Sequence, residues 1–188
     1  MSDSKDLTSL KQQDLRLIGP RLTLEPLVER DFSDEYLSWL NDPEISQFLE
    51  TRWTTQTPET VRAHIAKILN SPNELLLKIS RTISKQHIGN IKIGPVDANH
   101  NSTELSYFIG TKINWGKGYA TEAIGLCVEF GINRLGIHKF QAGCYERNIG
   151  SQKALQKAGF ELEGCLKKRF RDIDGKWQDQ FWFGLIRP

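Results

Sequence analysis

Hydrophobic residues follow two kinds of pattern along the 188-residue chain, one typical of helices and one typical of strands. Four segments repeat apolar residues at three- and four-residue steps, the pattern of a helix with one buried face, and they cover residues 31–40, 58–69, 119–135 and 148–159. Seven shorter runs rich in branched and aromatic residues predict strands at residues 21–26, 75–80, 88–93, 104–109, 139–145, 160–170 and 177–186. The pattern therefore predicts a mixed α/β (α+β) fold, with about four helices flanking a seven-stranded sheet.

The connections between these strands indicate the form of the sheet. Connectors with charge, asparagine and glycine join the three strands between residues 75 and 109, and Asp174-Gly175 joins the last two strands, as in antiparallel hairpins. One strand–helix–strand crossover runs from residue 104 to residue 145. We therefore expect a mostly antiparallel sheet with one crossover.

The first fourteen residues differ from the rest of the chain. Residues 1–14 are polar and show no apolar period, so we expect them to form a flexible N-terminal tail. Residues 15–188 have no internal repeat and no interdomain linker. They are expected to form a single domain that buries its own core.

Composition narrows the class of protein. A formal net charge of +2 gives no reason to expect nucleic acid as the main partner. The three cysteines are widely spaced without a CxxC pair, which suits a reducing compartment, and the four histidines are scattered, so no metal site is expected. No apolar run is long enough to span a membrane, and the polar N-terminus is unlike a secretory signal. We expect a cytoplasmic protein.

A glycine loop joins the strand at 104–109 to the helix at 119–135. Residues 114–121 read Asn-Trp-Gly-Lys-Gly-Tyr-Ala-Thr. Amide N–H groups in the first turn of a helix lack partners and attract anions, and glycine lets the anion approach the backbone. A Walker loop needs a longer glycine spacing, and the dinucleotide fingerprint needs a third glycine where this chain has Thr121. The loop predicts a phosphate cradle of another kind, and a tight turn before a helix is the alternative.

Two motifs resemble those of a known family. Residues 116–123 (Gly-Lys-Gly-Tyr-Ala-Thr-Glu-Ala) resemble the acetyl-CoA pyrophosphate loop of the GNAT (Gcn5-related) N-acetyltransferases. Asn148-x-x-Ser151, followed by Ala-Gly-Phe at 158–160, resembles a signature of their ribosomal-protein N-terminal acetyltransferase (Rim-type) branch. The resemblance extends from about residue 21 to the C-terminus. One departure is Ile113, where the family often has glutamine or arginine.

The resemblance implies a fold and a cofactor site. In the GNAT fold the sheet splays apart between its fourth and fifth strands, here 104–109 and 139–145, and acetyl-CoA lies in the resulting V. The loop amides would hold the pyrophosphate, and a free backbone N–H near Phe108 would polarise the thioester carbonyl. The cofactor-binding residues implied are Phe108, Ile109, Trp115, Gly116, Lys117, Gly118, Tyr119, Ala120, Thr121, Asn148 and Lys153.

Two residues are candidates for proton transfer, because N-acetylation needs a neutral amine and a proton for the departing thiolate. Glu104 matches the glutamate of the Rim-type Ala-Glu-x-x-Tyr strand, here Thr-Glu-Leu-Ser-Tyr at 103–107, and is the candidate base. Many GNAT enzymes use a tyrosine as acid where this chain has Leu155, whereas the Rim-type branch has a serine, here Ser151. The alternatives are a solvated glutamate at a strand end and a serine that satisfies a helix terminus.

The acceptor side is expected to contain Phe48, Arg52, Trp53 and Tyr145, which fall on segments that line the acceptor groove of similar proteins. Two acceptors fit: a protein N-terminal amine, or a small amine such as the amino group of a nucleotide-sugar. Residues 39–43 and 88–94 resemble Rim-like enzymes of carbohydrate pathways, which favours the second. The alternative is a catalytically silent acyl-CoA-binding module, to which the departures at Ile113 and Leu155 point. The oligomeric state expected is a monomer or a homodimer.

Overall fold

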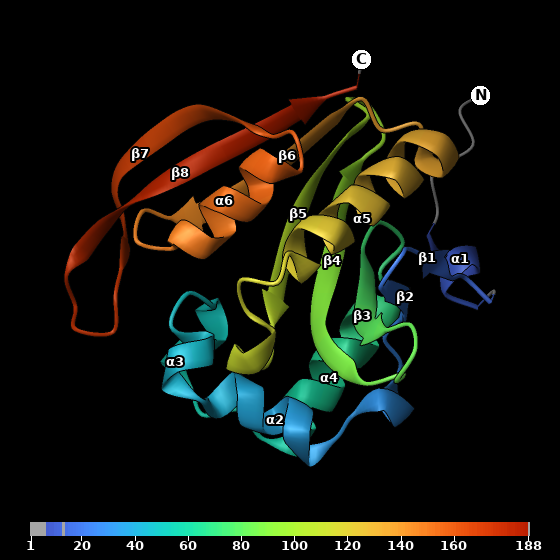
Figure 1. Ribbon diagram of the computed structural model, residues 1–188, viewed down its shortest axis with the longest axis horizontal. Coiled ribbons are helices and arrows are strands. Elements are labelled where there is room, and N and C mark those ends of the chain that lie inside the picture. Colours follow the sequence, from blue (N-terminus) through green and yellow to red (C-terminus); the bar gives the residue numbers. More distant parts are fainter. Residues whose placement is uncertain (1–6, 13, 188) are drawn as a thin grey trace.

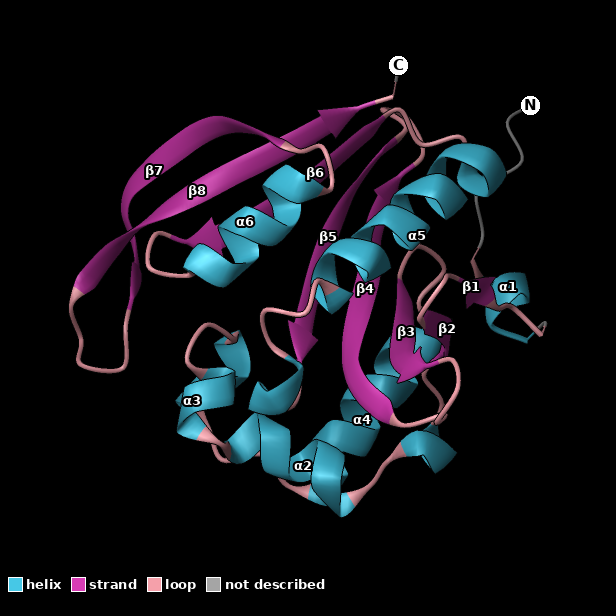
Figure 2. Ribbon diagram, in the orientation of Figure 1, coloured by secondary structure: helices cyan, strands magenta, loops and turns pink. Residues whose placement is uncertain are grey.

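The computed structural model describes residues 7–12 and 14–187, which form an eight-stranded sheet with helices on both faces (Figures 1 and 2). The strands are β1 (Leu17–Ile18), β2 (Leu22–Pro26), β3 (Leu75–Arg81), β4 (His87–Asp97), β5 (Ser102–Ile109), β6 (Lys139–Tyr145), β7 (Glu161–Arg171) and β8 (Trp177–Ile186). The helices are α1 (Thr8–Gln12), α2 (Asp34–Asn41), α3 (Pro43–Ser46), α4 (Pro58–Leu69), α5 (Tyr119–Leu135) and α6 (Ile149–Lys157). Short 3-10 helices cover Glu29–Asp31, Glu50–Trp53 and Lys112–Asn114.

The mostly antiparallel sheet is confirmed, with the strand order β1-β2-β3-β4-β5-β6-β8-β7. Within the described residues, β5 and β6 form the one parallel pair, and α5 is the crossover between them. The expected number of seven strands is one too low. The additional strand, β1, has two residues, which is too short to show a hydrophobic period.

Capping residues fix the ends of several helices. The side chain of Thr57 accepts a hydrogen bond from the Thr60 amide at 3.3 Å, and Pro58 opens α4. Gly136 ends α5 in the left-handed conformation, with a φ of 60°. The helix α3 was not predicted, because its four residues lie in a stretch without a clear period; Asp42 caps it with a side chain that accepts from the amides of residues 44 and 45.

The two faces of the sheet are covered by different helices. Alternate side chains of one strand point to opposite faces, and in β5 Leu105 joins the large core cluster with α5 whereas Phe108 joins a second cluster with α2 and α4. Figure 1 shows α5 and α6 in front of the sheet and α4 behind it. The molecule therefore has a three-layer arrangement in which β5 contacts both helical layers.

The structure differs from the expected flexible tail over part of residues 1–14. Residues 8–12 form α1, Leu7 is fully buried, and the Lys11 Nζ donates to the carbonyl oxygen of Ile68 at 2.6 Å. It also donates to the carbonyl of Ser71, so this lysine satisfies carbonyl groups at the end of α4. One buried leucine and one lysine are too few to produce a period in the sequence. Residues 1–6 and 13 lie outside the described residues.

Candidate active site

The central feature of the site is an opening between β5 and β6. The two strands pair only at residues 102–104 of β5 with residues 139–141 of β6. Beyond Glu104 the paired stretch ends, although β5 continues to Ile109 and β6 to Tyr145. Figure 1 shows the two strands diverging toward the ends that carry the glycine loop and the start of α6. The expected splay between the fourth and fifth predicted strands is thus present.

The register of β4 and β5 decides which amide groups face this opening. The amide of Gly110 donates to the carbonyl of Ile88 at 2.8 Å, and hydrogen-bonded pairs alternate along an antiparallel ladder. The next such pair is Asn90 with Phe108, so the Phe108 amide faces β4. The amides of Tyr107 and Ile109 face the opening instead. The donor expected near Phe108 is therefore supplied by its two neighbours.

The glycine loop lies at the open end of β5. Gly116 and Gly118 have φ values of 71° and 81°, in the left-handed region that favours glycine. A Cβ at Gly116 would meet nothing within 4 Å, so the backbone there is open. No side chain caps α5, whose first turn begins at Tyr119, and the Trp115 indole donates to the Ile109 carbonyl at 2.9 Å. The sequence-predicted loop residues 115–121 thus form an uncapped, open helix start that fits a pyrophosphate.

A contact that the sequence analysis missed holds this loop to β2. The guanidinium of Arg21 donates to the Lys117 carbonyl at 2.8 Å and to the Glu122 carboxylate at 2.7 Å, and it lies 4.9 Å from the centre of the Tyr119 ring. The same carboxylate accepts from the backbone amide of Leu22 at 3.0 Å. Glu122 belongs to the first turn of α5, where a negative charge is favourable. The loop is therefore fixed from outside by an ion pair.

The start of α6 lies across the opening from the loop. The Asn148 side chain caps α6 by accepting from the Ser151 amide at 3.1 Å. The Ser151 hydroxyl lies 2.9 Å from the Tyr107 hydroxyl, which also donates to the Ser151 carbonyl at 3.2 Å. Burial raises the pKa of the Tyr107 phenol well above its usual range, so it stays protonated as a donor. Tyr107 is the residue that sequence reasoning missed here, since an aromatic residue in a strand is ordinarily packing.

Glu104 lies at the position where the paired stretch ends. It is exposed, and strand alternation places its side chain on the face of Phe108 and α2, opposite to Tyr107 and Ser151. The structure therefore does not bring the two candidate catalytic residues together on one face. Lys153 is exposed on α6, and the structure gives it no contact that would fix it toward a phosphate.

The four expected acceptor-side residues do come together. The Arg52 guanidinium lies over the rings of Trp53 and Tyr145, at 4.3 and 4.9 Å from their centres, and donates to the Tyr145 hydroxyl. The ring centres of Phe48 and Tyr145 are 5.6 Å apart. The Tyr145 hydroxyl in turn donates to a carboxylate oxygen of Glu50, and burial raises the pKa of Tyr145 to about 12. Glu50 was missed, because nothing distinguishes one exposed glutamate in an aperiodic stretch.

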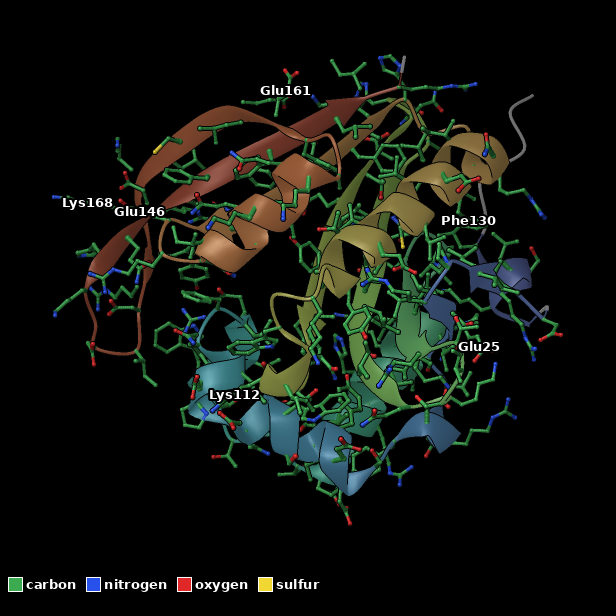
Figure 3. The ribbon with its side chains drawn as sticks, in the orientation of Figure 1. Glu25, Lys112, Phe130, Glu146, Glu161 and Lys168 are labelled. Carbon is green, nitrogen blue, oxygen red and sulfur yellow. The ribbon has the colours of Figure 1, made fainter. Side chains whose placement is uncertain are left out.

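An ion pair joins α3 to the chain that follows β5. Lys112, in the 3-10 helix after β5, contacts the carboxylate of Glu44 in α3 and lies 3.8 Å from that of Asp42. Figure 3 shows Lys112 beside α3. The segment between β5 and the glycine loop is therefore joined to the start of α3 by charged side chains.

No group of three histidine, cysteine or acidic side chains that could hold a metal ion occurs in the described parts of the chain. Among the helices of these parts, none is long and apolar enough to cross a membrane.

Comparison with known proteins identifies the family. The chain matches the family described as Acetyltransferase (GNAT) domain over residues 21–161. It therefore belongs to the GNAT acetyltransferase family. The sheet that splays beside an open glycine loop is the feature of this chain that corresponds to that class.

Two curated relatives illustrate the similarity. "Probable N-acetyltransferase YjcK" of Bacillus subtilis is 38% identical over 84 residues, which is 45% of each chain. The "[Ribosomal protein uS5]-alanine N-acetyltransferase" of Escherichia coli is 33% identical over 94 residues, 50% of this chain and 47% of that protein. These matches thus span about half the length of each relative.

Two solved structures show the same fold over nearly the whole chain. The ribosomal L7/L12 N-acetyltransferase RimL in complex with coenzyme A has a TM-score of 0.81 at 16% identity, covering 92% of this chain and 98% of that one. Spermidine N-acetyltransferase from Vibrio cholerae in complex with CoA and spermine has a TM-score of 0.79 at 20% identity, covering 89% and 96%. At these identities the likeness concerns the fold alone, so the acceptor of this chain has to be argued from its own residues.

Proposed function

We propose that this protein is an acetyl-CoA-dependent N-acetyltransferase of the ribosomal-protein (Rim-type) branch, and that it transfers the acetyl group by direct attack of a primary amine on acetyl-CoA. The acceptor is a small amine, such as the amino group of a nucleotide-sugar, or the N-terminal amine of a protein. The observation that carries the proposal is the opening between β5 and β6, which has free amides along β5 and an uncapped helix start at its end. A thioester in the opening would have its carbonyl oxygen beside the amides of Tyr107 and Ile109, which act as oxyanion donors.

Glu104 is the proposed base. The amine must lose a proton before or during attack, and Glu104 is an exposed carboxylate at the closed end of the opening. Its face of the sheet is the one that carries α2, on the side of the acceptor residues. In the reaction the amine nitrogen forms a bond to the carbonyl carbon, the carbon–sulfur bond breaks, and the amine proton passes to Glu104 directly or through water.

Ser151 is the proposed acid, supported by Tyr107. The departing thiolate takes a proton from the Ser151 hydroxyl, which regains one from solvent, while the Tyr107 hydroxyl 2.9 Å away stays protonated and holds the serine oxygen by a hydrogen bond. Because the two residues are on the opposite face from Glu104, base and acid serve different reactants and do not neutralise each other. Leu155, where other family members have a tyrosine, is fully buried, so the tyrosine of this chain would act from β5 instead.

Direct transfer is favoured over a covalent acetyl-cysteine. The cysteine nearest to the site is Cys144, whose thiol is buried, and burial raises its pKa to about 11. At neutral pH it is therefore protonated and a poor nucleophile. We also propose that the protein works in the cytoplasm as a monomer or a homodimer, which suits its free cysteines.

The test is incubation of the protein with acetyl-CoA and a panel of amines that includes a nucleotide-sugar amine and an N-terminal peptide, with the release of free thiol as readout. We expect amine-dependent thiol release, and mass spectrometry should show the acetyl group on the amine. The rival function, a silent acyl-CoA-binding module, predicts binding of acetyl-CoA by calorimetry without thiol release from any amine. That result would overturn the proposal.

A further inference from the structure

The last residues of β5 have a neighbouring strand on one edge only. β5 pairs with β6 as far as Glu104, so the stretch from residue 105 to residue 110 has β4 on one side and the opening on the other. The amides of Tyr107 and Ile109, which face the opening, lie in this stretch. Their direction therefore depends on what else fixes the end of β5.

One indole ring lies directly on this end of the strand. Gly110 is buried, and a Cβ on it would come within 2.1 Å of Cδ2 in the ring of Trp39. Trp39 belongs to α2 and is buried. Because any side chain at position 110 would occupy the space of the ring, only glycine allows α2 to pack this closely on the β5 backbone. The indole thus supports β5 where support from β6 has ended.

The same indole reaches β4 through His87. The ring centres of Trp39 and His87 are 5.0 Å apart at an angle of 71°, an edge-to-face contact. The His87 Nε2 lies 3.0 Å from the Gly89 carbonyl oxygen and 2.8 Å from the Asn90 Oδ1. Both partners are acceptors, so Nε2 carries a proton and donates, and burial lowers the pKa of the imidazole, which keeps it neutral at neutral pH. One histidine side chain therefore connects α2 to the backbone of β4.

The residues that His87 contacts are those that pair with the end of β5. In the ladder Gly89 is opposite Ile109, and Asn90 is opposite Phe108. A Cβ at Gly89 would lie 2.2 Å from the Phe108 carbonyl oxygen, so the two backbones are in direct contact here. Trp39 and His87 therefore contact both strands of the pair that sets the direction of the two free amides.

These contacts give a physical role to two segments that resemble Rim-like enzymes, residues 39–43 and 88–94. The first segment begins with the tryptophan that packs on Gly110, and it contains Asp42, whose carboxylate lies 3.8 Å from the Lys112 ammonium. The second segment contains the β4 residues that pair with the end of β5. Both segments therefore act on the stretch that leads from the free amides to the glycine loop.

We propose that Trp39 and His87 are positioning residues for acyl transfer. Together they hold the end of β5 so that the amides of Tyr107 and Ile109 stay directed at the thioester carbonyl oxygen. The inference rests on the proposed function, in which these amides are the oxyanion donors, and extends it to side chains that act through the backbone of β5. Such donors are effective because they are held in place before the reaction, and a misplacement of about 1 Å can cost roughly 10²-fold in rate.

Two substitutions break the contact from opposite sides. Gly110→Ala adds a methyl group where the indole lies, and Trp39→Leu removes the indole. Each should lower kcat roughly 10- to 100-fold, while the Kd for acetyl-CoA, measured by calorimetry, changes by less than about threefold. Gly125→Ala is the matched control, because a Cβ at Gly125 in α5 would meet nothing within 4 Å, and it should change neither. A normal kcat in the folded variants would overturn the role of Trp39.

The histidine is tested by a rescue. His87→Gln keeps an N–H donor near the position of Nε2, whereas His87→Leu removes it. We expect kcat to fall roughly tenfold in His87→Leu and to return to within about threefold of the wild-type value in His87→Gln. An equal loss in both variants, or a normal kcat in His87→Leu, would overturn the role of His87 as a positioning residue.

The infrared stretch of the bound thioester carbonyl separates this inference from the proposed function. Acetyl-CoA labelled with carbon-13 at the carbonyl is measured free and bound, without an amine. Hydrogen bonds from the two amides should lower the stretching frequency in the wild-type protein, and this shift should be lost in Trp39→Leu and Gly110→Ala but kept in Gly125→Ala. If Trp39→Leu fails to fold, Gly110→Ala and His87→Leu carry the comparison.

The outcomes of this measurement are distinct. A shift that is lost in the folded variants supports the positioning role even when no amine is acetylated, and then only the catalytic proposal fails. A shift that is kept in these variants would overturn the inference and leave the amides as donors. The absence of a shift in the wild-type protein would show that the amides are not donors, which would overturn both.

Discussion

The two sides of the opening are built in different ways. The proposed cofactor side is formed mainly by eight consecutive residues, 114–121, whose backbone amides and glycines would bind the pyrophosphate. The acceptor side is formed by side chains from separate segments: Arg52 contacts Tyr145 and the carbonyl of Arg171, which are 93 and 119 positions away in the sequence. A site made of backbone amides depends on a short glycine motif and little on the other side chains. In a site made of side chains, each substitution changes what the site can bind. The cofactor side therefore indicates the class of reaction, and the acceptor side holds the information on the substrate.

The largest expected effect is the loss of turnover on replacing Glu104, the proposed base, which acts on the acceptor amine. Glu104→Gln keeps the size of the side chain and removes its charge. If Glu104 is the base, turnover at neutral pH should fall roughly 10²–10⁴-fold, as for loss of a general base. The deficit should shrink at high pH, where solvent has already taken the proton of the amine.

The pH profile of turnover checks this prediction. A variant with a raised acceptor KM and nearly intact turnover would show that Glu104 only binds a cationic amine. If neither parameter changes, Glu104 is a solvated residue at a strand end.

The next largest effect is a loss of acetyl-CoA affinity on changing the glycine loop, which tests the cofactor side without altering the acceptor side. Gly118→Val puts a branched side chain on a backbone with a φ of 81°, where strain is about 1–3 kcal/mol. We expect acetyl-CoA affinity, measured by calorimetry, to fall roughly 10- to 100-fold as the loop adopts another conformation. Thermal unfolding should remain cooperative. Unchanged affinity would remove the loop from cofactor binding.

The proton donor should give a smaller effect. Ser151→Ala should lower turnover by at least about tenfold with little change in the KM for acetyl-CoA. Tyr107→Phe removes the contacts of the Tyr107 hydroxyl with the hydroxyl and the carbonyl of Ser151 and should lower turnover by less, roughly 3- to 10-fold. Steady-state kinetics of both single variants and of the double variant measure these losses of turnover. A loss of thermal stability with normal turnover would show that Ser151 only completes the helix terminus.

The smallest effect concerns the ion pair behind the glycine loop. Arg21→Gln removes the contacts of Arg21 with the Lys117 carbonyl and the Glu122 carboxylate, and we expect acetyl-CoA affinity to fall roughly 2- to 10-fold. Arg16→Gln is the matched control, because Arg16 pairs with Asp14 and Glu25 away from the loop. Equal changes in the two variants would mean that charge alone, and not the contact, affects binding.

The sequence predicted the parts of the fold that repeat a period or use a short motif. The four longer helices and seven of the strands appear at their expected places because each has enough residues to show a hydrophobic face. The helix α1 and strand β1 were missed because five and two residues cannot show one. Their positions depend on single contacts, such as that of Lys11 with the end of α4.

In the candidate site, too, only the part that lies in one short motif could be predicted from the sequence. The loop residues were assigned from their resemblance to a family motif, but the contact of Arg21 with Glu122 was not predicted, since 101 positions separate the two residues. Tyr107 belongs to the strand motif at 103–107, but only the structure shows that its hydroxyl lies beside Ser151. The amide that faces the opening depends on the register of β4 with β5, which no pattern in one strand reveals. Long-range pairing is thus the information that the sequence alone lacked.

Amide hydrogen exchange with and without acetyl-CoA shows where the cofactor lies. We expect new protection at the amides of Tyr107 and Ile109 and at residues 116–121, with no change in the edge strand β7. Protection confined to other segments, or an exchange pattern that acetyl-CoA leaves unchanged at saturating concentration, would contradict the placement of the cofactor between β5 and β6.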